Sequence, residues 1–95
     1  MSRYPNLGRL MDTYFNQDYD LYGDSDAEIL RVFASNSSEE QVRATMDEID
    51  IMLEEPLAGL ADRFRRATGE WNMIVGEDDA STRRWLLQAR AILTR

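Results

Sequence analysis

The stretch from Tyr14 to Asp26 concentrates the side chains of this sequence that are best suited to chemistry. It holds three tyrosines and four aspartates within thirteen residues. If Asp18 is taken as the first position of a calcium-binding loop, four residues fall where an EF-hand needs them: Asp20, Gly23, Asp24 and Asp26. However, Ile29 occupies the place of the bidentate glutamate, and Tyr22 stands where another oxygen ligand is needed. Because these ligands decide the affinity, we predict that the chain binds no metal.

Catalysis is equally hard to build from this composition. The chain has no cysteine, histidine or lysine, and its eleven basic residues are all arginines, which stay protonated in proteins. The remaining carboxylates and tyrosines would need strongly shifted pKa values to act near neutral pH. Paired carboxylates can hydrolyse glycosides, but a 95-residue helical bundle offers little room for a substrate cleft. We therefore expect a protein that is not an enzyme and has no cofactor and no small-molecule substrate.

The charge of the chain is strongly negative and unevenly distributed. The net charge is −7, and residues 1–55 hold thirteen acids and four arginines, whereas residues 56–95 hold five acids and seven arginines. The acidic first half repels the phosphates of nucleic acids and favours a basic protein as the partner. No long apolar run or basic-then-apolar N-terminus is present, so we expect no membrane contact and a cytoplasmic location.

Two acidic regions are predicted to contact this partner: the loop after the first helix and the acidic face of the third helix. Tyrosines can supply buried area there, while carboxylates bind arginine or lysine. For Asp18 and Asp20 an internal role is the alternative, in which each accepts hydrogen bonds from an arginine or from another helix N-terminus. For the third helix the alternative is an ordinary solvated face. The predicted contact residues are Asp18, Tyr19, Asp20, Tyr22, Asp24, Asp47, Asp50 and Glu54.

Five helical patterns position these residues. The first runs from about residue 5 to 16, with apolar residues at i, i+3, i+4, i+7 and i+8. A second is capped by Ser25 with Glu28 and ends near residue 36, and a third is capped at Ser37 or Ser38 and continues to about Glu54.

The second half of the chain predicts two more helices. A fourth helix starts at Pro56, places Leu57 on its apolar stripe and ends at Gly69, and a last helix follows the acids at 77–79. Its apolar stripe consists of Trp85, Leu86, Ala89, Ile92 and Leu93. We expect residues 70–77 to cover one end of the core. The sum is a single all-α domain over residues 1–95, a compact irregular bundle of about five helices.

The string from residue 14 to 20, YFNQDYD, resembles the YFHQDWD signature of a family of contact-dependent growth inhibition immunity proteins. Asn16 stands where that family often has histidine, and Tyr19 where it often has tryptophan. The Trp85-Leu86 pair also matches the C-terminal helix of the family. The resemblance implies an all-helical bacterial protein that binds and neutralises a cognate toxin domain.

Charge and resemblance together favour a stoichiometric inhibitor of a basic, nuclease-type toxin, monomeric when free. An acidic protein can be steered onto such a toxin and can block the surface that holds phosphates. The alternative is a small acidic helical interaction module, or a mimic of nucleic acid, that binds another basic protein.

Overall fold

The computed structural model describes residues 4–15, 25–68 and 78–94, and all regular structure within these ranges is helical. Five helices follow one another along the described part of the chain: α1 (Pro5–Tyr14), α2 (Asp26–Asn36), α3 (Glu39–Glu54), α4 (Leu60–Thr68) and α6 (Asp79–Leu93). The predicted all-α fold of about five helices is therefore confirmed.

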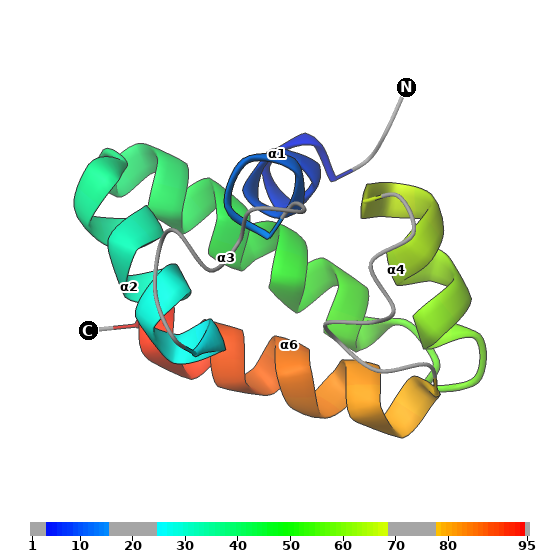
Figure 1. The fold of residues 1–95 in the computed structure, drawn as a ribbon. Coiled ribbons are helices and arrows are strands. Elements are labelled where there is room, and N and C mark those ends of the chain that lie inside the picture. Colours follow the sequence, from blue (N-terminus) through cyan, green and yellow to red (C-terminus); the bar gives the residue numbers. More distant parts are fainter. Residues whose placement is uncertain (1–3, 16–24, 69–77, 95) are drawn as a thin grey trace.

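The two longest helices, α3 and α6, pack side by side and run in opposite directions (Figure 1). α1 lies across α3 and is seen almost end-on in this view, while α4 packs against α1 and α6. α2 packs mainly against α6. Because these helices cross at different angles instead of aligning as in a regular four-helix bundle, the bundle is irregular, as predicted.

α1 begins at Pro5, whose fixed φ and missing N–H suit the first position of a helix. Its core face consists of three fully buried residues at helical spacing: Leu7, Leu10 and Met11. A Cβ atom on Gly8 would stand 3.3 Å from the carbonyl oxygen of Ala67, so the missing side chain lets α1 approach α4 closely. α1 ends at Tyr14, and Asn16, its predicted end, lies outside the described residues.

Side-chain caps start α2 and α3 where the sequence indicated. The Ser25 hydroxyl accepts a hydrogen bond from the Glu28 backbone N–H at 3.2 Å. At the start of α3, Ser38 and Gln41 form a complete capping box, in which each side chain accepts from the other residue's backbone N–H. Of the two predicted caps for α3, Ser38 is therefore the correct one, and each such cap stabilises its helix by about 1 kcal/mol.

The prediction for the start of the fourth helix is wrong. α4 begins at Leu60 instead of Pro56, and Leu57 is 49% exposed instead of lying on an apolar stripe. The cause is Gly59, whose φ of +85° lies in the left-handed region and interrupts the helical path. The buried face of α4 starts only with Leu60 and continues with Phe64.

Trp85 of α6 lies at the centre of the aromatic part of the core. The rings of Phe15 and Phe64 meet it edge to face, with centroids 5.4 and 5.8 Å away. Its indole N–H donates a hydrogen bond of 2.9 Å to Oδ2 of Asp26. Trp85 thus joins α6 to the end of α1, to α4 and to the first residue of α2, and each aromatic pair adds about 0.5–1.5 kcal/mol beyond burial.

Candidate partner-binding surface

The outer face of α3 presents two of the predicted contact residues to solvent. Asp47 and Glu54 are exposed, and neither accepts a hydrogen bond or forms an ion pair in the part of the chain that the structure describes. Ile51 lies between them at helical spacing and is 42% exposed. This side of α3 therefore offers carboxylates beside an exposed aliphatic group, which is a suitable composition for binding a basic protein.

Asp50, the third predicted contact residue on α3, is instead engaged inside the molecule. The Arg90 guanidinium of α6 donates from Nε to Oδ1 of Asp50 and from Nη2 to Oδ2, the latter at 3.2 Å. This hydrogen-bonded pair, helped by the charge of Asp50, raises the pKa of Arg90 above its ordinary value. A two-point bridge therefore joins α3 to α6, and a partner can use Asp50 only by sharing it with Arg90.

A groove of about 420 Å³ opens beside this bridge, where α2 ends, α3 passes and α6 ends. Apolar side chains from α3 and α6 line it: Val42, Met46 and Leu93. Asp47 and the Asp50–Arg90 pair line it as well. The structure thus brings two of the predicted contact residues, Asp47 and Asp50, to the wall of one groove, whereas Glu54 lies outside its lining.

The predicted contact residues of the loop after the first helix lie outside the described residues: Asp18, Tyr19, Asp20, Tyr22 and Asp24. Only the start of the string at 14–20 can be placed. Tyr14 packs edge to face against Phe33 at 5.5 Å, and Phe15 is fully buried against Trp85. The first two residues of the string therefore help to build the core.

Glu48 is an acid whose role sequence reasoning missed. It is only 7% exposed, and its carboxylate accepts hydrogen bonds from the backbone N–H groups of Asn6 at 3.2 Å and Leu7 at 2.9 Å. The Asn6 side-chain amide donates to the same carboxylate. Glu48 of α3 thus caps the N-terminus of α1, where a negative charge also complements the helix dipole.

The buried face of α3 is shifted from the apolar stripe that the sequence predicts, which consists of Val42, Met46, Ile49 and Leu53 with Met52 beside them. Ile49 and Met52 are buried as predicted, whereas Val42, Met46 and Leu53 are half-buried and pack against the core. The fully buried face is turned toward α1 and includes Thr45, Glu48 and Met52. The sequence places Glu48 on this face, because it lies three residues after Thr45 and four before Met52, on the same side of the helix.

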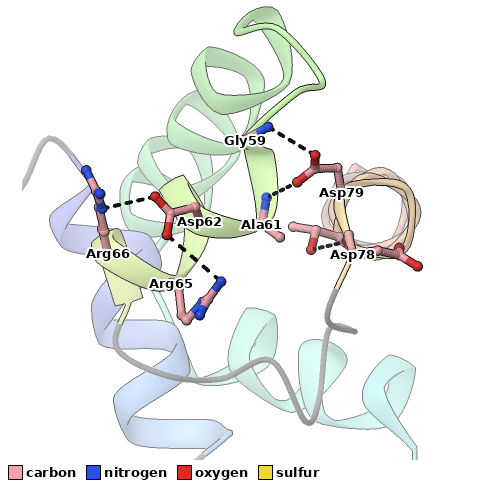
Figure 2. A network of polar contacts seen from close by, with 8 residues as sticks. Gly59, Ala61, Asp62, Arg65, Arg66, Asp78 and Asp79 are labelled. Atoms are coloured by element: carbon pink, nitrogen blue, oxygen red, sulfur yellow. Dashed lines mark hydrogen bonds and ion pairs between the residues drawn. The ribbon is translucent and has the colours of Figure 1, made fainter.

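Asp79 caps the N-terminus of α4 in the same way. Its carboxylate accepts from the backbone N–H groups of Gly59 at 3.0 Å and Ala61 at 2.8 Å, so the start of α6 caps the start of α4 (Figure 2). The hydrogen bonds from Ala61 and then Gly59 hold the pKa of Asp79 below its usual value. Asp78, the preceding residue, caps its own helix by accepting from the Ser81 backbone N–H, which likewise lowers the pKa of Asp78.

The arginines of α4 are also occupied by neighbouring groups. Arg66 and Arg65 approach the Asp62 carboxylate at 3.1 and 3.9 Å (Figure 2). Arg63 donates to the backbone carbonyls of Pro56 and Ala58 in the turn before the helix. These contacts favour a structural role for the arginines of α4 over nucleic-acid binding.

Within residues 4–15, 25–68 and 78–94, no group of three or more acidic, histidine or cysteine side chains is arranged to hold a metal ion. The EF-hand-like positions from Asp18 to Asp24 lie outside these ranges. Among the helices from α1 to α6 that the structure describes, none is both long and apolar enough to cross a membrane.

Comparison with known proteins identifies a family. A family model described as CdiI immunity protein covers residues 3–93, which is nearly the whole chain. No curated protein and no solved structure gives a significant match.

Proposed function

The chain belongs to the CdiI immunity protein family, and from this membership we propose that it is a stoichiometric inhibitor of a basic, nuclease-type toxin domain. Proteins of this family neutralise the toxins of contact-dependent growth inhibition and do not catalyse reactions. The chain is accordingly a toxin inhibitor and not an enzyme. The type of toxin, the one-to-one binding and the contact surface are the parts that we propose.

The observation that carries this proposal is that exposed carboxylates on α3, Asp47 and Glu54 above all, accept no hydrogen bond and form no ion pair among the described residues. A domain that cuts RNA or DNA needs a basic surface to hold phosphates. Acidic side chains that face solvent can steer an inhibitor onto such a surface, with association rates up to about 10⁸–10⁹ M⁻¹s⁻¹ at low salt. They can then occupy the place of the phosphates and keep the substrate out.

We propose two contact regions for the toxin. One is the outer face of α3, with Asp47, Glu54 and, through its pair with Arg90, Asp50. The other is the stretch of sequence between α1 and α2 in which acids and tyrosines are interleaved: Asp18, Tyr19, Asp20, Tyr22 and Asp24. Tyrosines provide buried area at the centre of an interface, and the carboxylates around them bind basic groups.

We also propose that the free protein is a monomer in the cytoplasm, as one domain over residues 1–95. A toxin that degrades nucleic acids must be neutralised where those nucleic acids are. The absence of cysteine means that the fold needs no oxidising compartment. A surplus of exposed acids also opposes self-association of identical surfaces.

Titration calorimetry against the toxin domain encoded immediately upstream tests this function. We expect one-to-one nanomolar binding that weakens between about 0.05 and 0.5 M salt, because charges in solvent are screened over about 8 Å at physiological ionic strength. The nuclease activity of the toxin, measured in parallel, should disappear at one equivalent of inhibitor. Absence of binding would leave the acidic interaction module as the better description.

A further inference from the structure

We propose that the groove between the end of α2, α3 and the end of α6 receives a lysine or arginine side chain of the toxin domain. This inference rests on the proposed function, and it names the chemistry of the contact. Asp47 accepts the hydrogen bond from the basic group, whereas Asp50, which is bound by Arg90, forms part of the groove wall.

The floor of the groove suits the aliphatic stem of such a side chain. Val42 and Met46 line the groove and pack against the hydrophobic core from a half-buried position, and Leu93 is nearly fully buried. Lysine and arginine bury three or four methylene groups along apolar surfaces while their charged ends stay in a polar environment. A volume of about 420 Å³ is large enough for a lysine or arginine side chain together with atoms of the residues next to it in the toxin.

Of the three carboxylates that line the groove, Glu39 and Asp47 stand outside the bridge to Arg90, and the charge of Asp47 acts on Arg90 beside that bridge. Asp50 is already held at two points by Arg90. Asp47 is exposed and accepts no hydrogen bond within the described residues, although its charge contributes to the raised pKa of Arg90. With Glu39 and Arg43, the lining carries three acids and two arginines, so the groove as a whole is negative.

Helix ends of both polarities meet at the groove. The groove is lined by Ala34 and Ser37 at the end of α2, and by Leu93 and Thr94 at the end of α6. A helix C-terminus carries about half a negative charge on its free carbonyl groups, and an N-terminus about half a positive charge. The α3 N-terminus at Glu39 lies beside the end of α2, and Arg90 lies in the last turn of α6, so the negative character of the groove comes mainly from its carboxylates.

Matched charge changes inside and outside the groove test the proposal. Asp47→Asn and Gln88→Arg both raise the net charge by one, but Gln88 is an exposed residue of α6 that does not line the groove. We expect Asp47→Asn to weaken binding of the cognate toxin domain by about tenfold or more, since it removes a charge-assisted hydrogen bond. Gln88→Arg should change the dissociation constant by no more than about threefold, through long-range attraction alone.

A second pair of substitutions lowers the net charge by one, and the substitution inside the groove should strengthen binding of the toxin domain. Arg43→Gln removes a positive charge from the groove lining and should tighten binding several-fold, whereas Gln88→Glu, with the same change in net charge, should have a smaller effect. Arg43, Asp47 and Gln88 are all exposed, so circular dichroism should show unchanged folding for all four variants.

The outcomes separate this inference from the proposed function. If the wild-type protein does not bind the toxin domain, the proposed function fails and the groove proposal fails with it. If the wild type binds but Asp47→Asn has no larger effect than Gln88→Arg, the toxin docks elsewhere and only the groove proposal is overturned. Equal effects of Arg43→Gln and Gln88→Glu would lead to the same rejection.

Discussion

Replacing Glu48 by alanine should destabilise the protein far more than its position among the acids of α3 suggests. The substitution leaves the backbone N–H groups of Asn6 and Leu7 without their acceptor, and the bond to Leu7 is buried. An unsatisfied buried donor costs about 1–3 kcal/mol, and the lost charge at the α1 N-terminus adds about 0.3–1 kcal/mol. We expect a total of about 2–4 kcal/mol, which lowers the melting temperature of a domain of this size by roughly 10–25 °C.

Glu54→Ala is the matched control, because it makes the same chemical change on the same helix at an exposed position, and Glu54 accepts no hydrogen bond from any residue in the described ranges. It should alter the free energy of unfolding by no more than about 0.5 kcal/mol. Urea titrations followed by circular dichroism measure both values, and hydrogen exchange of the Asn6 and Leu7 amides reports on the cap itself. Similar costs for the two variants, or unchanged exchange at these amides, would show that Glu48 does not hold α1 in the way described.

Three further substitutions address other contacts of the fold. Asp79→Asn should lower the melting temperature at neutral pH, because the carboxylate that caps α4 is lost. Since the hydrogen bonds from Ala61 and Gly59 hold the folded-state pKa of Asp79 below 3.8, its contribution is fully present above that value and is lost as the pH falls through the lowered pKa. The difference from the wild type should therefore stay constant above about pH 5 and shrink below about pH 4, as melting curves at several pH values can test. Trp85→Phe removes the N–H donor to Asp26 and should cost at least about 1 kcal/mol in a urea titration. Leu57→Ser should be nearly neutral in the same assay, within about 0.5 kcal/mol, because Leu57 is exposed and not part of an apolar stripe.

Local signals in the sequence were sufficient for most of the helices. Apolar residues at helical spacing identified α1 and α6, and the serines before α2 and α3 marked their first turns, because a side-chain cap acts within four residues of chain. The start of α4 was misplaced since proline and glycine both interrupt a helix there. Pro56 is compatible with a first turn, but the positive φ of Gly59 moves the start to Leu60.

The internal roles of individual acids could not be predicted in the same way. Glu48 and Asn6 are separated by 42 residues, and Asp79 and Gly59 by 20, so each cap exists only once the helices have packed. In sequence, Glu48 resembles its exposed neighbour Asp47, and Asp50 resembles Glu54. Whether an acid of α3 makes an internal contact or faces solvent depends on the side of the helix on which it lies. The packing of α3 against α1 and α6 determines which side is internal.

Acids on the described helices differ in whether another part of the fold binds them. Glu48, Asp79 and Asp26 accept hydrogen bonds from N–H groups of other helices. Asp50 is bound by Arg90. The negative charge of each of these four acids is therefore compensated largely within the fold. Asp47 and Glu54 have no such partner in the described ranges, and their fields extend into solvent over about a Debye length. We therefore expect recognition of the toxin through α3 to depend more on Asp47 and Glu54 than on the acids that are held within the fold. Exchange of Asp47 or Glu54 should leave the contacts that Glu48, Asp79 and Asp26 make between helices intact.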